Sequence, residues 1–132
     1  MSIELSYQQE VNYLLVKMSG QWTEENMRQA LEAIRDEATK RSQTRLLVDA
    51  REIPRPETEM TRAFSGEHWA RILGPPFKSA VLVKPEVYNK FMESVAVSRG
   101  AIGRGFFEKE VALEWLLEPG ESLPSAARAR ER

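Results

Sequence analysis

The chain has 132 residues, of which 42% are hydrophobic and 30% are charged, and its formal net charge is -1. This composition predicts one globular domain and excludes a disordered chain. The small net charge argues against nucleic acid and anionic membranes as partners, and the lack of cysteine excludes disulfides, thiol redox chemistry and cysteine-bound zinc.

No window approaches the roughly 20 apolar residues of a membrane-spanning helix. The first four residues form neither a positively charged leader nor an apolar signal core. We therefore expect a cytoplasmic protein with no membrane span, and no motif points to a cofactor.

The first half of the chain predicts a hairpin, a helix and a central strand. Alternating residues 3–8 predict an edge strand, and the more apolar residues 13–18 predict its hairpin partner. Thr23 is suited to cap a helix with acidic residues in its first turn. The predicted buried stripe of this helix consists of Met27, Ala30, Leu31, Ile34 and Ala38.

Residues 44–51 predict the central strand. Leu46, Leu47 and Val48 form an unbroken apolar run, as expected for a strand covered on both faces. Asp49 and Arg51 follow at its carboxyl end, the sheet edge where α/β proteins bind ligands. They share strand parity, so they form either a small polar site or a structural ion pair.

The second predicted helix begins after the cap Thr58 and ends near Leu73. Met60 and Phe64 lie on one face, whereas Trp69 and Leu73 are rotated by about half a turn at ~100° per residue. Two interpretations remain open. Trp69 and Leu73 form an exposed surface for a partner, or the helix is wedged between two neighbours.

Residues 77–83 predict another buried strand, and Pro85 is placed for the first turn of a third helix. The inward side of this helix is predicted to consist of Val87, Tyr88, Phe91, Met92 and Val95. The glycine-containing residues 99–105 then form either a simple turn or an anion-binding nest.

Phe106 and Phe107 predict a short last strand, followed by a compact helix at residues 108–117. This helix is predicted to bury Val111, Ala112, Trp115 and Leu116. We expect residues 1–119 to form the domain and residues 120–132 to be a flexible tail.

The order β-β-α-β-α-β-α-β-α predicts an α/β fold with a mostly parallel sheet and an antiparallel member from the hairpin. Together with its motifs, this pattern resembles the SpoIIAA-like branch of the STAS domain superfamily. The resemblance rests on YLLVKMSG at 13–20, RLLVDAR at 45–51, KSAVLV at 78–83, and SRG with FFEKEVALEWLL within 98–117.

The resemblance implies a single domain with a five-stranded mixed sheet and surrounding helices. It also implies a non-enzymatic, cytosolic bacterial regulatory module that binds a protein partner or itself, as anti-sigma factor antagonists do. In those proteins a serine after the central strand accepts phosphate, which weakens partner binding. Here Asp49 is followed by Ala50 and Arg51, and the nearest hydroxyls are the candidate phosphoacceptors Thr58 and Thr61.

The sequence contains no catalytic or metal-binding signature. Its single histidine, His68, is expected to be partly buried and hydrogen-bonded rather than a ligand contact. No acid, base and nucleophile can be paired from the sequence, so we expect neither an enzyme nor a metal site.

Two functions remain after these exclusions. The first is a protein-interaction module that uses Trp69 and Leu73. The alternative is a protein that binds a lipid or other amphiphile in a cleft between the second and third helices. The apolar residues assigned to that cleft are Met60, Phe64, Tyr88, Phe91 and Met92, and Trp22 is placed with Trp69 along a surface groove.

A basic rim is expected near the carboxyl end of the central strand, where it would meet a phosphate or carboxylate. Its predicted members are Arg62, Lys84, Arg99 and Arg104. The full set of candidate binding residues is Asp49, Arg51, Arg62, Phe64, His68, Trp69, Leu73, Lys84, Arg99 and Arg104.

Overall fold

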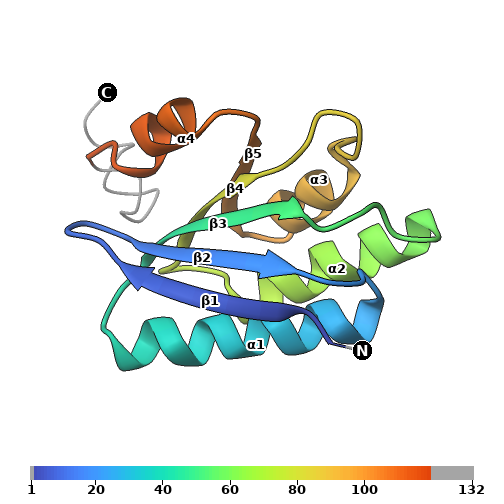
Figure 1. Ribbon diagram of the computed structural model, residues 1–132, viewed down its shortest axis with the longest axis horizontal. Coiled ribbons are helices and arrows are strands. Elements are labelled where there is room, and N and C mark those ends of the chain that lie inside the picture. Colours follow the sequence, from blue (N-terminus) through green and yellow to red (C-terminus); the bar gives the residue numbers. More distant parts are fainter. Residues whose placement is uncertain (1, 120–132) are drawn as a thin grey trace.

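The computed structural model describes residues 2–119, which form one sheet and four helices in the predicted order (Figure 1). The elements are β1 (Glu4–Gln9), β2 (Leu14–Ser19), α1 (Glu24–Lys40), β3 (Arg45–Glu52), α2 (Glu59–Ile72), β4 (Lys78–Leu82), α3 (Phe91–Ser98), β5 (Ile102–Phe106) and α4 (Lys109–Leu116). The predicted α/β fold is therefore confirmed. The predicted tail, residues 120–132, lies outside the described residues.

The sheet has five strands in the order β1-β2-β3-β4-β5. The hairpin strands β1 and β2 are antiparallel, and every later pair is parallel. Leu47 of β3 lies opposite Leu15 of β2 and Ala80 of β4. Leu46, Leu47 and Val48 are all buried, which confirms β3 as the central strand.

Strand parity separates the sheet into two apolar faces. Leu46 and Val48 belong to the face that packs against α1, α2 and α3. Leu47 belongs to the other face, which packs against α4. Figure 1 shows α1 and α4 on opposite sides of the sheet. Side chains that are neighbours in a strand therefore reach different surroundings.

The first helix forms as its sequence predicts. Thr23 Oγ1 accepts a hydrogen bond from the Asn26 N–H at 3.0 Å, and Glu24 and Glu25 lie in the first turn. Both features stabilise a helix N-terminus. All five residues of the predicted stripe are buried.

The second helix is wedged between α1 and α3. Trp69 and Leu73 are only 5% and 1% exposed, so the prediction that they form an exposed partner surface is wrong. Helix α3 approaches closely at Gly66, where a Cβ atom would lie 2.6 Å from the Met92 carbonyl oxygen. With neighbours on both sides, α2 buries two faces, which explains its scattered apolar residues.

The third helix begins at Phe91 rather than at Pro85. Residues 84–90, here called the strap, form a turn in which the Val87 N–H donates to the Lys84 carbonyl at 3.0 Å. Lys90 has a left-handed backbone (φ 70°), which interrupts helical geometry before Phe91. The predicted inward side is correct for Met92, which packs against the core, but wrong for Phe91, which is 42% exposed, and the fully buried residue of α3 is Ala96.

The glycine-containing segment begins with the predicted simple turn, at Arg99 and Gly100, and its residues 102–105 then belong to β5. A Cβ atom at Gly103 would lie 2.1 Å from Trp69 Cζ2, and one at Gly105 would lie 2.8 Å from Tyr88 Cε1. The glycines therefore allow two aromatic rings to lie directly on the strand.

The last helix buries Ala112 and Leu116, as predicted, but Val111 is exposed and Trp115 is half-buried. Its last turn is attached to the sheet by Lys78, whose Nζ donates to the Trp115 carbonyl at 2.6 Å. Within the described part of the chain, none of the helices has the length and apolar character that crossing a membrane requires.

The central position of β3 predicts a large effect of Leu47→Ala. Leu47 is fully buried, so the substitution leaves a cavity that costs about 2–5 kcal/mol of unfolding free energy. Urea denaturation measures the loss, and Val11→Ala, at a side chain that is 92% exposed, is the matched control. A loss no larger than that of the control contradicts the assignment of the core.

Candidate functional site

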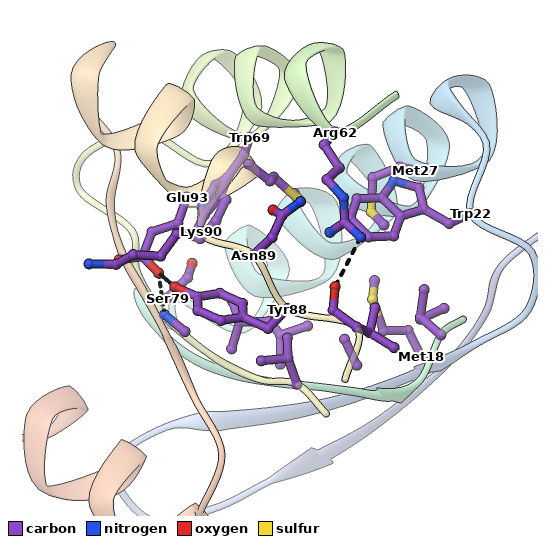
Figure 2. A pocket seen from close by; sticks show the side chains of 18 of the residues that line it. Met18, Trp22, Met27, Arg62, Trp69, Ser79, Tyr88, Asn89, Lys90 and Glu93 are labelled. Carbon is purple, nitrogen blue, oxygen red and sulfur yellow. Dashed lines mark hydrogen bonds between the residues drawn. The ribbon is translucent and has the colours of Figure 1, made fainter. Parts of the chain in front are cut away.

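A cavity lies between the sheet, α2 and the strap (Figure 2). Its floor includes Met18, Val48 and Val81, so it lies on the face that packs against α1, α2 and α3. Trp22 and Trp69 also line it. The space open to the centre of a water molecule is about 90 Å³, several times the ~10–15 Å³ that one water needs.

Arg62 of α2 is a charged residue buried in the wall of this cavity, with 4% of its surface exposed. Its Nη2 donates to the Val87 carbonyl of the strap at 2.9 Å, and its Nε donates to Glu59 Oε2 at 3.1 Å. Its guanidinium carbon lies 5.2 Å from the centre of the Trp22 ring. These contacts offset part of the cost of burying a charge.

Glu59 and Asn89 form a second link between α2 and the strap. Asn89 Nδ2 donates to Glu59 Oε1 at 2.8 Å, and the Phe91 N–H donates to Asn89 Oδ1 at 2.9 Å. The hydrogen bond from Asn89, followed by that from Arg62, holds the pKa of Glu59 below its ordinary value. Glu59 therefore accepts both bonds as a carboxylate at neutral pH.

Tyr88 and Glu93 attach the strap to β5. The Tyr88 hydroxyl donates to Glu93 Oε1, which also accepts the Gly105 N–H at 3.0 Å. Burial raises the pKa of Tyr88, and the bond to Glu93 raises it further. Tyr88 therefore remains a protonated donor at neutral pH.

Ser79 is a buried polar residue of β4 that lines the same cavity, with 1% of its surface exposed. Its hydroxyl has no hydrogen-bond partner within residues 2–119. Buried polar atoms are nearly always hydrogen-bonded, and an unsatisfied one lowers stability. Ser79 is therefore an unusual feature of the cavity wall.

The structure brings four of the candidate residues to the cavity: Arg62, Trp69, Leu73 and Lys84. Of the apolar residues assigned to a cleft between α2 and α3, Tyr88 and Met92 line it. Met60, Phe64 and Phe91 do not, because their side chains are exposed on the outer surface.

Asp49 and Arg51 lie on the other face of the sheet, because their parity matches that of Leu47. They form a bidentate pair, with Arg51 Nε 2.9 Å from Asp49 Oδ1 and Nη2 2.8 Å from Oδ2. Hydrogen bonding from Arg51 holds the pKa of Asp49 below its ordinary value. This geometry agrees with the structural interpretation of the pair.

The predicted common basic rim is wrong, because its members lie on different surfaces. Arg62 and Lys84 line the cavity. Arg99 pairs with Glu67 at 3.0 Å in a separate hollow. Arg104 lies opposite Ala80, on the α4 face, with its guanidinium carbon 5.3 Å from the Phe106 ring centre.

His68 joins α2 to α1 through a contact of 3.1 Å between its Nε2 and Glu24 Oε2, and Arg71 Nη2 lies 2.6 Å from its Nδ1. This arrangement agrees with the expected structural role.

Thr58 Oγ1 caps α2 by accepting the Thr61 N–H at 3.3 Å. Residues 2–119 contain no group of three or more histidine and acidic side chains that could hold a metal ion.

Sequence reasoning missed Ser79, Asn89, Lys90 and Glu93 as cavity residues. Ser79 interrupts a buried strand, and this was an available signal. Asn89, Lys90 and Glu93 lie at the end of the strap and in the first turn of α3, where the sequence pattern predicted one continuous helix from Pro85. They line the cavity because α3 begins only at Phe91.

Neither a protein-family model nor a curated protein sequence matches this chain. Several solved structures are similar to it, among them the following two. One is an uncharacterised protein of the DUF3478 family with a SpoIIAA-like fold, from Shewanella loihica PV-4. It superposes with a TM-score of 0.57 and 20% sequence identity, and the match covers 87% of this chain and 93% of the Shewanella chain. The other is an anti-sigma factor antagonist from Mycobacterium paratuberculosis, with a TM-score of 0.62 and 14% sequence identity. That match covers 89% of this chain and 96% of the Mycobacterium chain. The chain therefore has a SpoIIAA-like fold.

The unsatisfied hydroxyl predicts that Ser79→Ala stabilises the ligand-free protein. The substitution removes a buried polar atom and changes the volume little, so unfolding free energy should rise by about 1 kcal/mol. Urea denaturation measures the change, and Ser65→Ala is the control, because the Ser65 hydroxyl accepts the Trp22 indole N–H at 2.9 Å. Ser65→Ala should destabilise. Equal destabilisation by both substitutions contradicts the description of Ser79.

The lowered pKa of Asp49 predicts that its pair with Arg51 contributes stability above the unfolded-state pKa of about 3.9. That contribution is lost as pH falls through the lower folded-state value. The difference in unfolding free energy between the wild type and Arg51→Gln should therefore be constant above about pH 5 and shrink in acid. Urea titrations across this range, with Lys40→Gln as the control, measure it. A difference that grows in acid contradicts the assignment.

Proposed function

We propose that this protein is a non-enzymatic, cytoplasmic regulatory module that acts by binding another protein. Its SpoIIAA-like fold is shared with an anti-sigma factor antagonist over 89% of the chain. The observation that carries the proposal is a group of exposed apolar side chains on two adjacent helices.

This α2–α3 surface consists of Met60 and Phe64 of α2 and Phe91 of α3, which are 60%, 38% and 42% exposed. Met60 and Phe64 are one helical turn apart and lie on the same side of α2. The bond between Glu59 and Asn89 places the start of α2 near the start of α3. Large apolar side chains gathered at a protein surface are typical of binding sites for other proteins.

Phosphate on Thr58 or Thr61 is the proposed control of this surface. Thr58 is exposed and caps α2, and both threonines lie within one turn of Met60. A phosphate there would add negative charge beside Glu57 and Glu59 and next to an apolar contact. Like-charge repulsion and desolvation would then weaken partner binding.

A second candidate function is the binding of a small ligand, and the cavity is the observation that favours it. Its wall is mostly apolar and contains a few polar groups, as is typical of ligand sites. The two candidates use different surfaces, because Met60, Phe64 and Phe91 do not line the cavity.

The double substitution Met60→Ser and Phe64→Ser should abolish partner binding with little effect on folding. The experiment is chemical cross-linking of the tagged protein in extracts of its source cells, followed by mass spectrometry of the captured proteins. The expected result is one stoichiometric partner captured by the wild type and absent from the double variant. Native mass spectrometry of the purified protein tests self-association at the same surface.

Val11→Ser is the matched control, because Val11 is 92% exposed and belongs to the turn between β1 and β2. It should capture the same partner as the wild type. Circular dichroism checks that each variant is folded. Capture of the same partner by the folded double variant contradicts the proposed surface.

A further inference from the structure

We propose that the cavity binds a short-chain organic acid that carries a second oxygen, with its carboxylate at Arg62 and the second oxygen at Ser79. This inference deepens the second candidate function and rests on it. It specifies the chemical class of the ligand, which the fold does not.

Arg62 supplies the anchor for the carboxylate. A guanidinium has five N–H donors, and Arg62 directs one from Nε to Glu59 and one from Nη2 to the Val87 carbonyl. Its Nη1 makes none of the hydrogen bonds found within residues 2–119. Figure 2 shows the guanidinium reaching from α2 into the cavity. A carboxylate is the group whose geometry and charge best match these remaining donors.

The charges around the cavity also favour an anion. Arg62, Lys84 and Lys90 line it, whereas Glu93 is its one carboxylate within the described residues. Glu93 already accepts hydrogen bonds from Tyr88 and Gly105. The cavity is therefore locally positive in a chain whose formal net charge is -1, and such a cleft concentrates anions.

Ser79 supplies the second anchor. Ser79 lines the cavity, and its hydroxyl is buried and has no hydrogen-bond partner within residues 2–119. Figure 2 shows Ser79 and Arg62 on opposite sides of the cavity, so one ligand can meet both only if it has polar groups at two positions. A carbonyl or hydroxyl oxygen on the ligand would remove the cost of the unsatisfied Ser79 hydroxyl.

The size of the cavity limits the length of the ligand. The space open to the centre of a water molecule is about 90 Å³, against the ~10–15 Å³ that one water needs, so the cavity holds a compact molecule. A long acyl chain does not fit this space. Of the lipid or other amphiphile that the sequence left as the alternative ligand, we therefore retain a short amphiphilic acid, with an apolar body between its two polar ends.

The first test compares matched ligands on the wild-type protein by NMR at neutral pH. The probe is 4-oxopentanoate, and its controls are the neutral amide 4-oxopentanamide and the acid pentanoate, which lacks the keto oxygen. Binding should shift the indole N–H signals of Trp22 and Trp69, which line the cavity, and leave that of Trp115 unchanged. We expect 4-oxopentanoate to bind at least tenfold more tightly than the amide and at least threefold more tightly than pentanoate.

The second test assigns each preference to a residue. Arg62→Gln should remove the preference for the acid over the amide, whereas Arg99→Gln, at an arginine outside the cavity, should retain it. Ser79→Ala should remove the preference for 4-oxopentanoate over pentanoate and leave the acid preference unchanged. The ligand comparison on the wild type remains decisive if Arg62→Gln does not fold.

Three results overturn the inference. If 4-oxopentanoate and 4-oxopentanamide bind with equal affinity, Arg62 does not bind a carboxylate, although the small-ligand function is retained. Tighter binding of dodecanoate than of 4-oxopentanoate, with shifts at Trp22 and Trp69, replaces the short acid by a lipid-like ligand. If none of these compounds shifts either signal, the inference and the small-ligand function both fail, and the protein-binding proposal is unaffected.

Discussion

The buried guanidinium of Arg62 is the interaction on which the arrangement of the cavity depends. An unpaired buried charge is very costly, so Arg62 must be satisfied where it lies. It donates to the strap at Val87 and to Glu59 on its own helix, and it lies over the ring of Trp22. One side chain thus connects α2, the strap and the segment that precedes α1. The side chains of Tyr88 and Asn89, the next two residues of the strap, hold it further by hydrogen bonds to Glu93 and Glu59.

Strand parity decides which polar groups can act together. Ser79 and Val81 of β4 face the cavity, whereas Lys78 faces α4 and donates to the Trp115 carbonyl. Asp49 follows Val48 by one residue and therefore lies on the other face from it. The two faces are separated by the thickness of the sheet, so charges that are close in sequence belong to different environments. The cavity owes its polar character to residues from several elements rather than to one motif.

Helix α2 takes part in both proposed functions. Its Met60 and Phe64 side chains face outward, while Arg62 and Trp69 face the interior. A helix packed between two neighbours must bury more than one face, and this explains why its apolar residues follow no single stripe. Gly103 of β5 completes the packing, because the ring of Trp69 occupies the place of a side chain there.

The amino-acid sequence was enough to predict the order of the elements, the central position of β3, the buried stripe of α1 and the threonine caps of α1 and α2. These features depend on local periodicity and on hydrogen bonds between residues three apart, so they can be predicted from neighbouring letters. Contacts in the tertiary structure set the start of α3 at Phe91, the burial of Trp69, the inclusion of residues 102–105 in β5 and the separation of Arg62 from Arg99 and Arg104. Each of these features depends on contacts between distant segments. Side chains of α2 and α3 hold the strap, and the aromatic rings of Trp69 and Tyr88 pack against the glycines of β5. Local patterns carry no information about such contacts. The sequence therefore marked Arg62 as a candidate by its charge, but it did not show that Ser79 and Glu93 line the same cavity.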